Sequence, residues 1–546
     1  MPPPPPPSAD ASMRHKVQRL QQQQREEQEE RLKAQQVQRF QRFAMEYEIN
    51  VQFPAAVESA IADSKPRTDP DLIQHRLLEA GFLYDVPVAA GETLALATAF
   101  CADLERTGCF NSVQAELGKA PPAEEQGDGA QPAQAAQVLR VKLDEKQWYR
   151  LHAGGGVKTD GLLSPEAAQS TGFLPVAEFD ASVGLRNLTG HLDQTNLQYT
   201  LDTQSTASWT LSHERPLYTA LPASLKDLVL EQSTGSQYSM TTRAVLDTVD
   251  YEWTRSYKEF QRLFSVTVSN HHSVRAAEQA PGLYYGLEWS TVFRDLVPRR
   301  HPTTPFAFAA SPEIVSQAGP DVKHSLAVEF RTNDTFLDHA SNPTAGVELH
   351  GKAELATPPG DVGFLKCHGG LSMHLPVLDA HDISLHGSLT GGLLQSLSFG
   401  GLCRPAGISD RFFMGGPVNL RGFMPAGIGP RATAPKGSCS PGGDALGGDF
   451  FYSATAMASA VPSPIASLLD PLGIRLLAFC NVGTCVGAIA ETPLQAVLQS
   501  TRASVGVGIA SSVMGPRVEA TYAWPLRYGP RDARRHFQLG MGFSFG

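Results

Sequence analysis

The chain of 546 residues lacks any run of about 18 apolar residues, so no segment has the length and hydrophobicity of a transmembrane helix. Its most apolar region, residues 465–490, is interrupted by Asp470, Pro471 and Arg475. This pattern fits a soluble protein, and it also fits a membrane β-barrel, whose strands give only weak hydropathy signals. The N-terminal stretch MPPPPPPSADASMRHKVQRL contains no apolar core, and we therefore expect no secretory signal peptide.

Charged residues are also scarce, and acidic residues outnumber basic ones. Only 18% of the residues are charged, and the formal net charge is −10. A nucleic-acid-binding protein typically carries a basic patch or stripe, so this balance argues against a nucleic-acid partner. The sequence has no His-Glu-x-x-His, Gly-x-Ser-x-Gly or Walker A motif, and we expect neither an enzymatic reaction nor a cofactor.

Cysteine occurs seven times and without a pattern. No two cysteines form a Cys-x-x-Cys pair, and an odd, scattered set lacks the spacing of a disulfide framework. Clustered Cys and His ligands for a zinc ion are missing as well. We therefore expect free cysteines that serve as small hydrophobic residues, and no metal site.

The first 147 residues divide into an extension and a small domain. Residues 1–44 are a proline tract followed by a Gln-, Glu- and Arg-rich stretch, which predicts disorder and then a solvated helix, alone or in a coiled coil. Residues 45–147 predict the order β-α-α-β-β, with one helix that starts at Asp69 and stops at Gly81. Two helices on a three-stranded sheet would form a compact α/β domain.

Residues 148–546 have a different character, because apolar and polar residues alternate with a period of two. Examples are FDASVGLRN at 179–187, SLAVEFR at 325–331 and RVEATYAW at 517–524. Runs of about nine residues match tilted membrane-spanning strands, and their polar faces suit a wet lumen. The sequence thus predicts a mainly β fold, with an antiparallel transmembrane barrel of about 16 strands. A soluble β-domain is the alternative.

The stretch DRFFMGGPVNLRGF, residues 410–423, resembles the signature loop of the outer-membrane barrel-assembly superfamily, the BamA-like proteins with POTRA domains and a barrel. GIGPR, GGDALGGDFFYSA, LLAFCNVGT and VEATYAWPLR follow in that family's order. The resemblance is specific over residues 405–546, and residues 60–145 resemble a single POTRA domain. The Gly-Gly-Pro turn and the Asn481 of FCNVG are most similar to the mitochondrial branch, the core barrel subunits of the sorting and assembly machinery.

The resemblance implies that residues 411–445 form a long loop folded back into the lumen and held there by an arginine. Gly415, Gly416 and Pro417 would form a turn, and Gly422 would allow a close approach to the wall. Phe423 would pack the loop in place, and Arg421 would be the arginine that holds it. A buried arginine requires a partner. The candidate partners are Asp444, Asp449, Glu519 and Asn481. The loop would serve as a structural brace or as a contact for clients.

A lateral seam between the first and last barrel strands is the second candidate site. The first strand, YRLHAGGGVKTDG, contains Gly154, Gly155 and Gly156, which weaken packing and pairing. The last strand is similar to the mitochondrial β-signal, polar-x-Gly-x-x-hydrophobic-x-hydrophobic. Its seam residues would be Gln538, Gly540, Gly542, Phe543 and Phe545. Alternatively, the glycines relieve crowding where the barrel curves.

The function implied by the resemblance is insertion and folding of β-barrel precursors in the mitochondrial outer membrane, by templating client strands at the seam. Its partners would be precursor proteins, accessory subunits of the sorting and assembly complex, and outer-membrane lipids. The POTRA-like domain would face the intermembrane space. The alternatives are a polypeptide-conducting import or secretion pore in a plastid or bacterial outer membrane and, more remotely, a barrel enzyme such as a lipase.

Overall fold

The computed structural model describes residues 48–542 apart from 62–63, 83–85, 120–136, 159–175, 203–205, 218–237, 271–282, 302, 305–306, 333–336, 339–342, 379–382, 418, 433–441, 462–472, 489–491 and 512–516. The chain divides into two compact units, of which the first ends at Lys146 and the second begins at Gln147. The expected extension, residues 1–44, lies outside the described residues, as do Phe543 and Phe545.

The first unit is a small α/β domain with one strand more than the sequence predicted. Its elements are β1 (Glu48–Ser59), α2 (Pro70–Glu79), β2 (Pro87–Ala89), α3 (Ala90–Arg106), β3 (Phe110–Lys119) and β4 (Gln137–Glu145). The sheet has four strands in the order β2-β1-β4-β3, in which only β1 and β4 run parallel. The expected three-stranded sheet was wrong because the short strand β2 pairs with the start of β1.

The helix α2 begins and ends where the sequence predicted. The Asp69 side chain accepts a hydrogen bond from the Asp71 amide at 3.1 Å, as an N-cap residue does. Gly81 follows the helix with φ +97°, a conformation that glycine adopts without strain. The apolar faces of both helices and the sheet are buried, including Leu77, Leu104, Val141 and Leu143.

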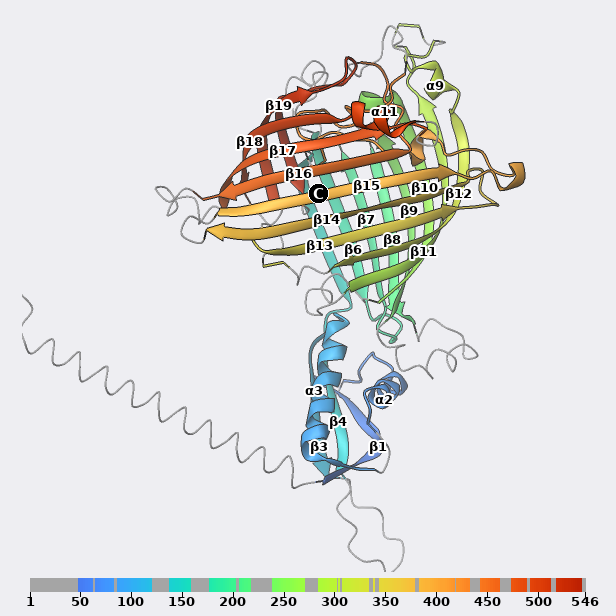
Figure 1. Cartoon of the computed structure of the whole chain (residues 1–546). Coiled ribbons are helices and arrows are strands. Elements are labelled where there is room, and N and C mark those ends of the chain that lie inside the picture. The colour runs from blue at the N-terminus through green and yellow to red at the C-terminus, as the bar shows by residue number, and fades with distance from the viewer. Residues whose placement is uncertain are drawn as a thin grey trace, which may run out of the picture. The chain divides into compact units, whose positions relative to one another are not determined.

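The second unit is one antiparallel sheet of 16 strands, β5 to β20, in which each strand pairs with the next along the chain. Figure 1 shows these strands curving round into a barrel. The strands are β5 (Tyr149–Lys158), β6 (Val176–Arg186), β7 (Gln194–Asp202), β8 (Ala207–Pro216), β9 (Ser239–Asp250), β10 (Tyr257–Ser269), β11 (Leu283–Pro298), β12 (Gly319–Thr332), β13 (Gly346–Ala356), β14 (Phe364–Leu378), β15 (Ile383–Ser396), β16 (Phe450–Ala460), β17 (Ile474–Val486), β18 (Arg502–Ser511), β19 (Arg517–Arg527) and β20 (Phe537–Gly542). The short helices between them are α7 (Glu252–Arg255), α9 (Pro312–Val315), η4 (Phe399–Gly401), η5 (Ile408–Asp410) and α11 (Leu494–Gln499).

The strands alternate as the sequence predicted, with large apolar side chains exposed on one face. On β11, Leu287, Trp289 and Phe293 are 46%, 39% and 54% exposed, whereas Ser290 and Arg294 between and beside them are buried. Exposed apolar residues at every second position are expected of a surface that faces lipid. The buried residues of the other face line the inside of the curved sheet.

Two further observations concern the described residues as a whole. No described helix is long and apolar enough to cross a membrane. The six cysteines in the described part of the chain are free, and three of them, Cys109, Cys403 and Cys485, are buried.

Candidate functional site: an inserted segment that contacts the last strand

The chain between β15 and β16, residues 397–449, forms the candidate site, and we call it the inserted segment. It contacts widely separated parts of the sheet order. Asp410 pairs with Arg294 of β11, whereas Arg421 pairs with Glu519 of β19. Because the described residues of this segment reach strands so far apart in the order, they lie in the interior around which the sheet curves.

The tip of this segment, residues 415–423, is shaped by glycines in conformations that other residues rarely adopt. The φ angles of Gly415, Gly416 and Gly422 are +118°, +100° and +91°. Gly422 also approaches the wall closely, since an added Cβ would lie 3.2 Å from the β-carbons of one residue on β18 and one on β19. A larger residue at position 422 would therefore push the tip away from the wall.

The arginine of the tip forms a buried ion pair with the barrel wall. Arg421 Nη2 donates to Glu519 Oε2 at 2.8 Å, and the two residues are 5% and 8% exposed. The guanidinium lies 5.2 Å from the centre of the Phe479 ring on β17, and the Arg421 carbonyl accepts a hydrogen bond from Ser504 Oγ at 2.5 Å. The tip is thereby bound to three consecutive strands, β17 to β19.

The other three candidate partners of this arginine have different neighbours. Asp444 accepts a hydrogen bond from Ser256 Oγ at 2.6 Å, and Asp449 lies 3.7 Å from the guanidinium of Arg411. Asn481 is fully buried, and neither atom of its amide has a hydrogen-bond partner among the described residues. Of the four candidate partners, Glu519 is therefore the one that contacts Arg421 among the described residues.

The last strand is bound to the tip through two of its predicted seam residues. The Gln538 side chain accepts a hydrogen bond from the Gly422 amide at 2.8 Å and donates one to the Phe423 carbonyl at 2.7 Å. Two residues on, Gly540 lies against Pro417, because an added Cβ would be 2.9 Å from the proline Cβ. The structure thus joins the two predicted sites, the tip and the last strand, which sequence reasoning had treated separately.

The strands β5 and β20 are the two ends of the sheet order, and no ladder joins them among the described residues. Gly154, Gly155 and Gly156 lie on β5, where they pair with β6. An added Cβ on Gly154 would lie 2.6 Å from Asp180 Oδ1 on β6, so relief of crowding explains that one glycine. Gly542 is the last residue of β20.

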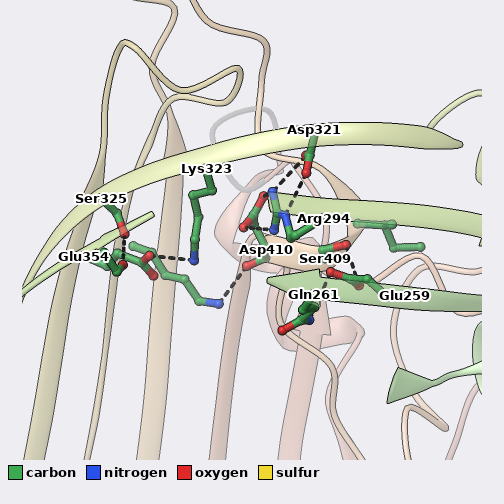
Figure 2. A network of polar contacts seen from close by, with 12 residues as sticks. Glu259, Gln261, Arg294, Asp321, Lys323, Ser325, Glu354, Ser409 and Asp410 are labelled. Atoms are coloured by element: carbon green, nitrogen blue, oxygen red, sulfur yellow. Dashed lines mark hydrogen bonds and ion pairs between the residues drawn. The ribbon is translucent and has the colours of Figure 1, made fainter. Parts of the chain in front are cut away.

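A second anchor, which sequence reasoning missed, holds the start of the inserted segment (Figure 2). Arg294 donates to Asp321 of β12 at 2.9 Å and to Asp410 of the segment at 2.7 Å, and the Lys366 Nζ of β14 donates to the Asp410 carbonyl at 2.7 Å. Arginine, as a planar group with several donors, can bind two carboxylates at once. Asp410 is the first residue of DRFFMGGPVNLRGF, but sequence does not indicate which strand it meets.

Within the inserted segment, Arg431 joins two limbs of the chain. It donates to the carbonyls of Ala426 and Gly443 at 2.8 and 2.7 Å. Burial lowers the pKa of Arg431, and the negative charges of Asp532 and Asp444 oppose that shift. The segment therefore carries its own internal brace beside its contacts with the wall.

Comparison with known proteins identifies the family. The sequence model described as the Omp85 superfamily domain matches residues 177–545, which is more than half of the chain. The chain belongs to the Omp85 superfamily. The fold agrees, because this Omp85 protein aligns with the crystal structure of BamA from Haemophilus ducreyi lacking POTRA domains 1–3, at a TM-score of 0.64 and 17% identity, over 90% of this chain and 84% of that one. The expected family and the expected barrel of about 16 strands are confirmed.

Curated relatives of this Omp85 protein carry names from the sorting and assembly machinery. A SAM50-like protein of Schizosaccharomyces pombe is 30% identical over 243 residues, covering 43% of this chain and 47% of its own length. The sorting and assembly machinery component 50 homologue of Xenopus tropicalis is 31% identical over 274 residues, covering 47% and 52%. The sorting assembly machinery 50 kDa subunit of Saccharomyces cerevisiae is 27% identical over 290 residues, covering 50% and 53%. The chain spans about half the length of the curated relatives it matches.

Proposed function

We propose that this Omp85 protein inserts and folds β-barrel precursor proteins in the mitochondrial outer membrane. Client strands would pair with the barrel at a lateral seam between β5 and β20. The observation that carries the proposal is the binding of Gln538 and Gly540 by the tip. These residues fill the polar and glycine positions of the β-signal pattern, and both lie on the strand at the edge of the seam. The names of the relatives support the same function.

The physical problem that such a protein solves is the cost of unpaired backbone groups in lipid. Each N–H or C=O group without a hydrogen-bond partner costs several kcal/mol in hydrocarbon, so a lone strand of about nine residues faces a barrier of tens of kcal/mol. An exposed strand edge supplies the missing partners by β-augmentation. A client strand that enters along β5 or β20 therefore avoids most of that cost.

The seam is the weakest line of the sheet in the described residues. All consecutive strands from β5 to β20 are joined by ladders, and most of these ladders have nine or more paired positions. The described part of β20 pairs with β19 over only six positions, from Phe537 to Gly542.

The proposal includes the partners and the orientation. Accessory subunits of the sorting and assembly complex and outer-membrane lipids would surround the barrel. The first unit would form a single POTRA-like domain in the intermembrane space, where the edge strands β2 and β3 of its sheet could receive or release client segments.

The test is to close the seam covalently. Cysteines at positions 155 on β5 and 541 on β20, in a chain without its native cysteines, are joined with a short bismaleimide crosslinker. A matched control joins position 155 to position 179, because Gly155 and Phe179 are already paired partners on β5 and β6. Both proteins are reconstituted in liposomes, and insertion of a precursor with a C-terminal β-signal is followed over time.

We expect the crosslink from 155 to 541 to abolish insertion and the control crosslink from 155 to 179 to leave it intact. Unchanged insertion after complete closure of the seam would eliminate the lateral-opening mechanism. Passage of ions or peptides through the barrel, with no acceleration of precursor insertion by the uncrosslinked protein, would instead indicate a polypeptide-conducting pore.

A further inference from the structure

Two neighbouring turns at one end of the barrel expose an unusual combination of residues. They hold α11, between β17 and β18, and residues 528–536, between β19 and β20, and we call these two described stretches together the basic rim. Antiparallel order places both turns at the same end of the sheet as the inserted segment. On α11, Leu494 and Leu498 are 74% and 56% exposed and lie four positions apart, so they share one face of the helix.

The β19–β20 turn is strongly basic in a chain whose net charge is −10. Residues 528–536 contain three arginines, at positions 531, 534 and 535, and a single acidic residue, Asp532. That acid is already occupied, because Arg502 of β18 binds both of its oxygens at 2.9 and 3.2 Å. Arg531 and Arg534 are exposed and have no acidic partner in the described part of the chain. Their charge is therefore available to a ligand.

The arginines lie next to the outward, apolar face of the barrel. On β19, Trp524 and Leu526 point outward and are 46% and 63% exposed, and Tyr528 follows them at the start of the turn. The Arg534 guanidinium lies over the Tyr528 ring, 3.8 Å from its centre. Aromatic residues with cationic groups just beyond an apolar band are typical of the boundary between the membrane interior and the lipid headgroups.

The two turns are held together and are backed by the inserted segment. Arg527 donates to the carbonyl of Gln499, the last residue of α11, at 2.8 Å. The Ala533 amide donates to the Gly427 carbonyl at 2.9 Å, and the Ala533 carbonyl accepts from the Met424 amide at 2.8 Å. The hydrogen bonds with the inserted segment, whose tip binds β20, therefore hold the basic rim in a defined position.

We propose that the basic rim binds the phosphate groups of anionic lipids in the adjacent membrane leaflet. Arg531 and Arg534 would each donate hydrogen bonds to a phosphate oxygen, and the exposed leucines and aromatic residues would contact the acyl chains. A lipid fits better than an acidic protein, because Arg534 contacts Tyr528, which follows the exposed apolar residues Trp524 and Leu526 of β19. The inference rests on the proposed membrane location of the barrel, but not on client insertion.

The experiment measures the lipid preference at Trp524, which lies on β19, the strand that leads into the turn with the two arginines. The full chain is reconstituted in phosphatidylcholine vesicles that contain either brominated phosphatidylcholine or brominated phosphatidylglycerol, and quenching of tryptophan fluorescence gives the relative association of the two lipids. The Trp524→Phe variant identifies the contribution of this tryptophan. The test variant is Arg531→Gln/Arg534→Gln, with Arg531→Lys/Arg534→Lys as the charge-conserving control.

We expect Trp524 of the wild-type protein to be quenched preferentially by the anionic lipid. Each arginine near an anionic surface contributes about fivefold to the preference, so the double glutamine variant should lose most of it and the lysine variant should keep most of it. Arg150→Gln, which removes an exposed arginine where β5 begins, at the other end of the sheet, should change nothing. Added salt should weaken the preference.

Equal quenching by the two lipids in the wild-type protein would overturn the inference, as would an unchanged preference in the glutamine variant. If that variant kept its lipid preference and lost a co-purifying subunit, the basic rim would be a protein-docking surface instead. Precursor insertion is measured separately, in vesicles of phosphatidylcholine alone. A barrel that prefers anionic lipid but does not accelerate insertion would refute the proposed function and leave this inference standing.

Discussion

The ion pair between Arg421 and Glu519 should make a large contribution to the stability of the barrel, and replacement of the arginine tests it. In Arg421→Ala, the Glu519 carboxylate loses its cation while it stays buried inside the sheet. The backbone hydrogen bond from Ser504 to residue 421 survives, because it ends on a carbonyl. The substitution therefore removes the charge and the side chain of the tip, and leaves its main-chain attachment in place.

The expected magnitude follows from the burial of the pair. Removal of one partner of a buried ion pair costs about 3–5 kcal/mol, because the remaining charge is uncompensated. Loss of the contact with the Phe479 ring adds about 0.5–2 kcal/mol. Against this, Arg421 Nε has no hydrogen-bond partner among the described residues. We therefore expect a loss of about 3–5 kcal/mol of unfolding free energy in total.

The measurement is a double-mutant cycle. Arg421→Met, Glu519→Leu and the combined variant are reconstituted in lipid vesicles and unfolded with urea. Tryptophan fluorescence and heat-dependent migration in gels measure the fraction of folded barrel. Each single substitution should destabilise strongly, whereas the combined one should cost less than either, because an apolar pair of similar volume leaves no buried charge. Additive losses in the combined variant, or an Arg421→Met barrel as stable as the wild type, would refute the role assigned to the ion pair.

Three further predictions concern the other contacts. Gln538→Leu removes two hydrogen bonds and leaves two buried backbone groups of the tip without partners. We therefore expect the unfolding free energy to fall by about 2–4 kcal/mol and the tip to be proteolysed faster. Gln538→Glu is the control of similar size. Asp410→Asn should destabilise the barrel by about 2–4 kcal/mol, because Arg294 then keeps only Asp321, and Arg294→Met in the same chain should destabilise it further, because Asp321 then has no cation. Burial raises the pKa of Glu145, but hydrogen bonds from Thr68 and Arg67 outweigh burial and hold the pKa below its usual value. The stability that these bonds provide is therefore present above about pH 4.3 and is lost as the pH falls through the lowered pKa. Hydrogen exchange at the Thr68 amide should rise in that range in the wild type and not in Glu145→Gln.

The sequence predicted the strands of the barrel because their alternation is a local property. At residues 325–331 the leucine, valine and phenylalanine that it assigned to one face are all exposed on the outside of β12. The helix start at Asp69 was predictable for the same reason, because its cap involves neighbours two residues apart. The strand Pro87–Ala89 was not predicted, since three residues show no periodicity and its pairing with Glu48–Asn50 depends on the tertiary fold.

The contacts of the candidate site could not be derived from the sequence, because each joins residues far apart in the chain. Glu519 lies 98 positions after Arg421, and four polar residues were equally suitable partners for that arginine. The distinction depends on which strand the tip faces, and this follows from the register of the whole sheet. The hydrogen bonds of Gln538 with the tip span 115 and 116 positions and have no sequence signal of their own.

The attachments of the tip differ in strength, and the difference determines which strand can move. The contact with β20 consists of two hydrogen bonds of Gln538, worth about 0.5–1.5 kcal/mol each, and the packing of Pro417 on Gly540. The contact with β19 is the buried ion pair, whose loss costs about 3–5 kcal/mol. Movement of β20 away from the tip is therefore the less costly of the two. We infer that the tip stays on β19 while β20 moves, so that the sheet opens at its last strand and the rest of the barrel keeps its shape.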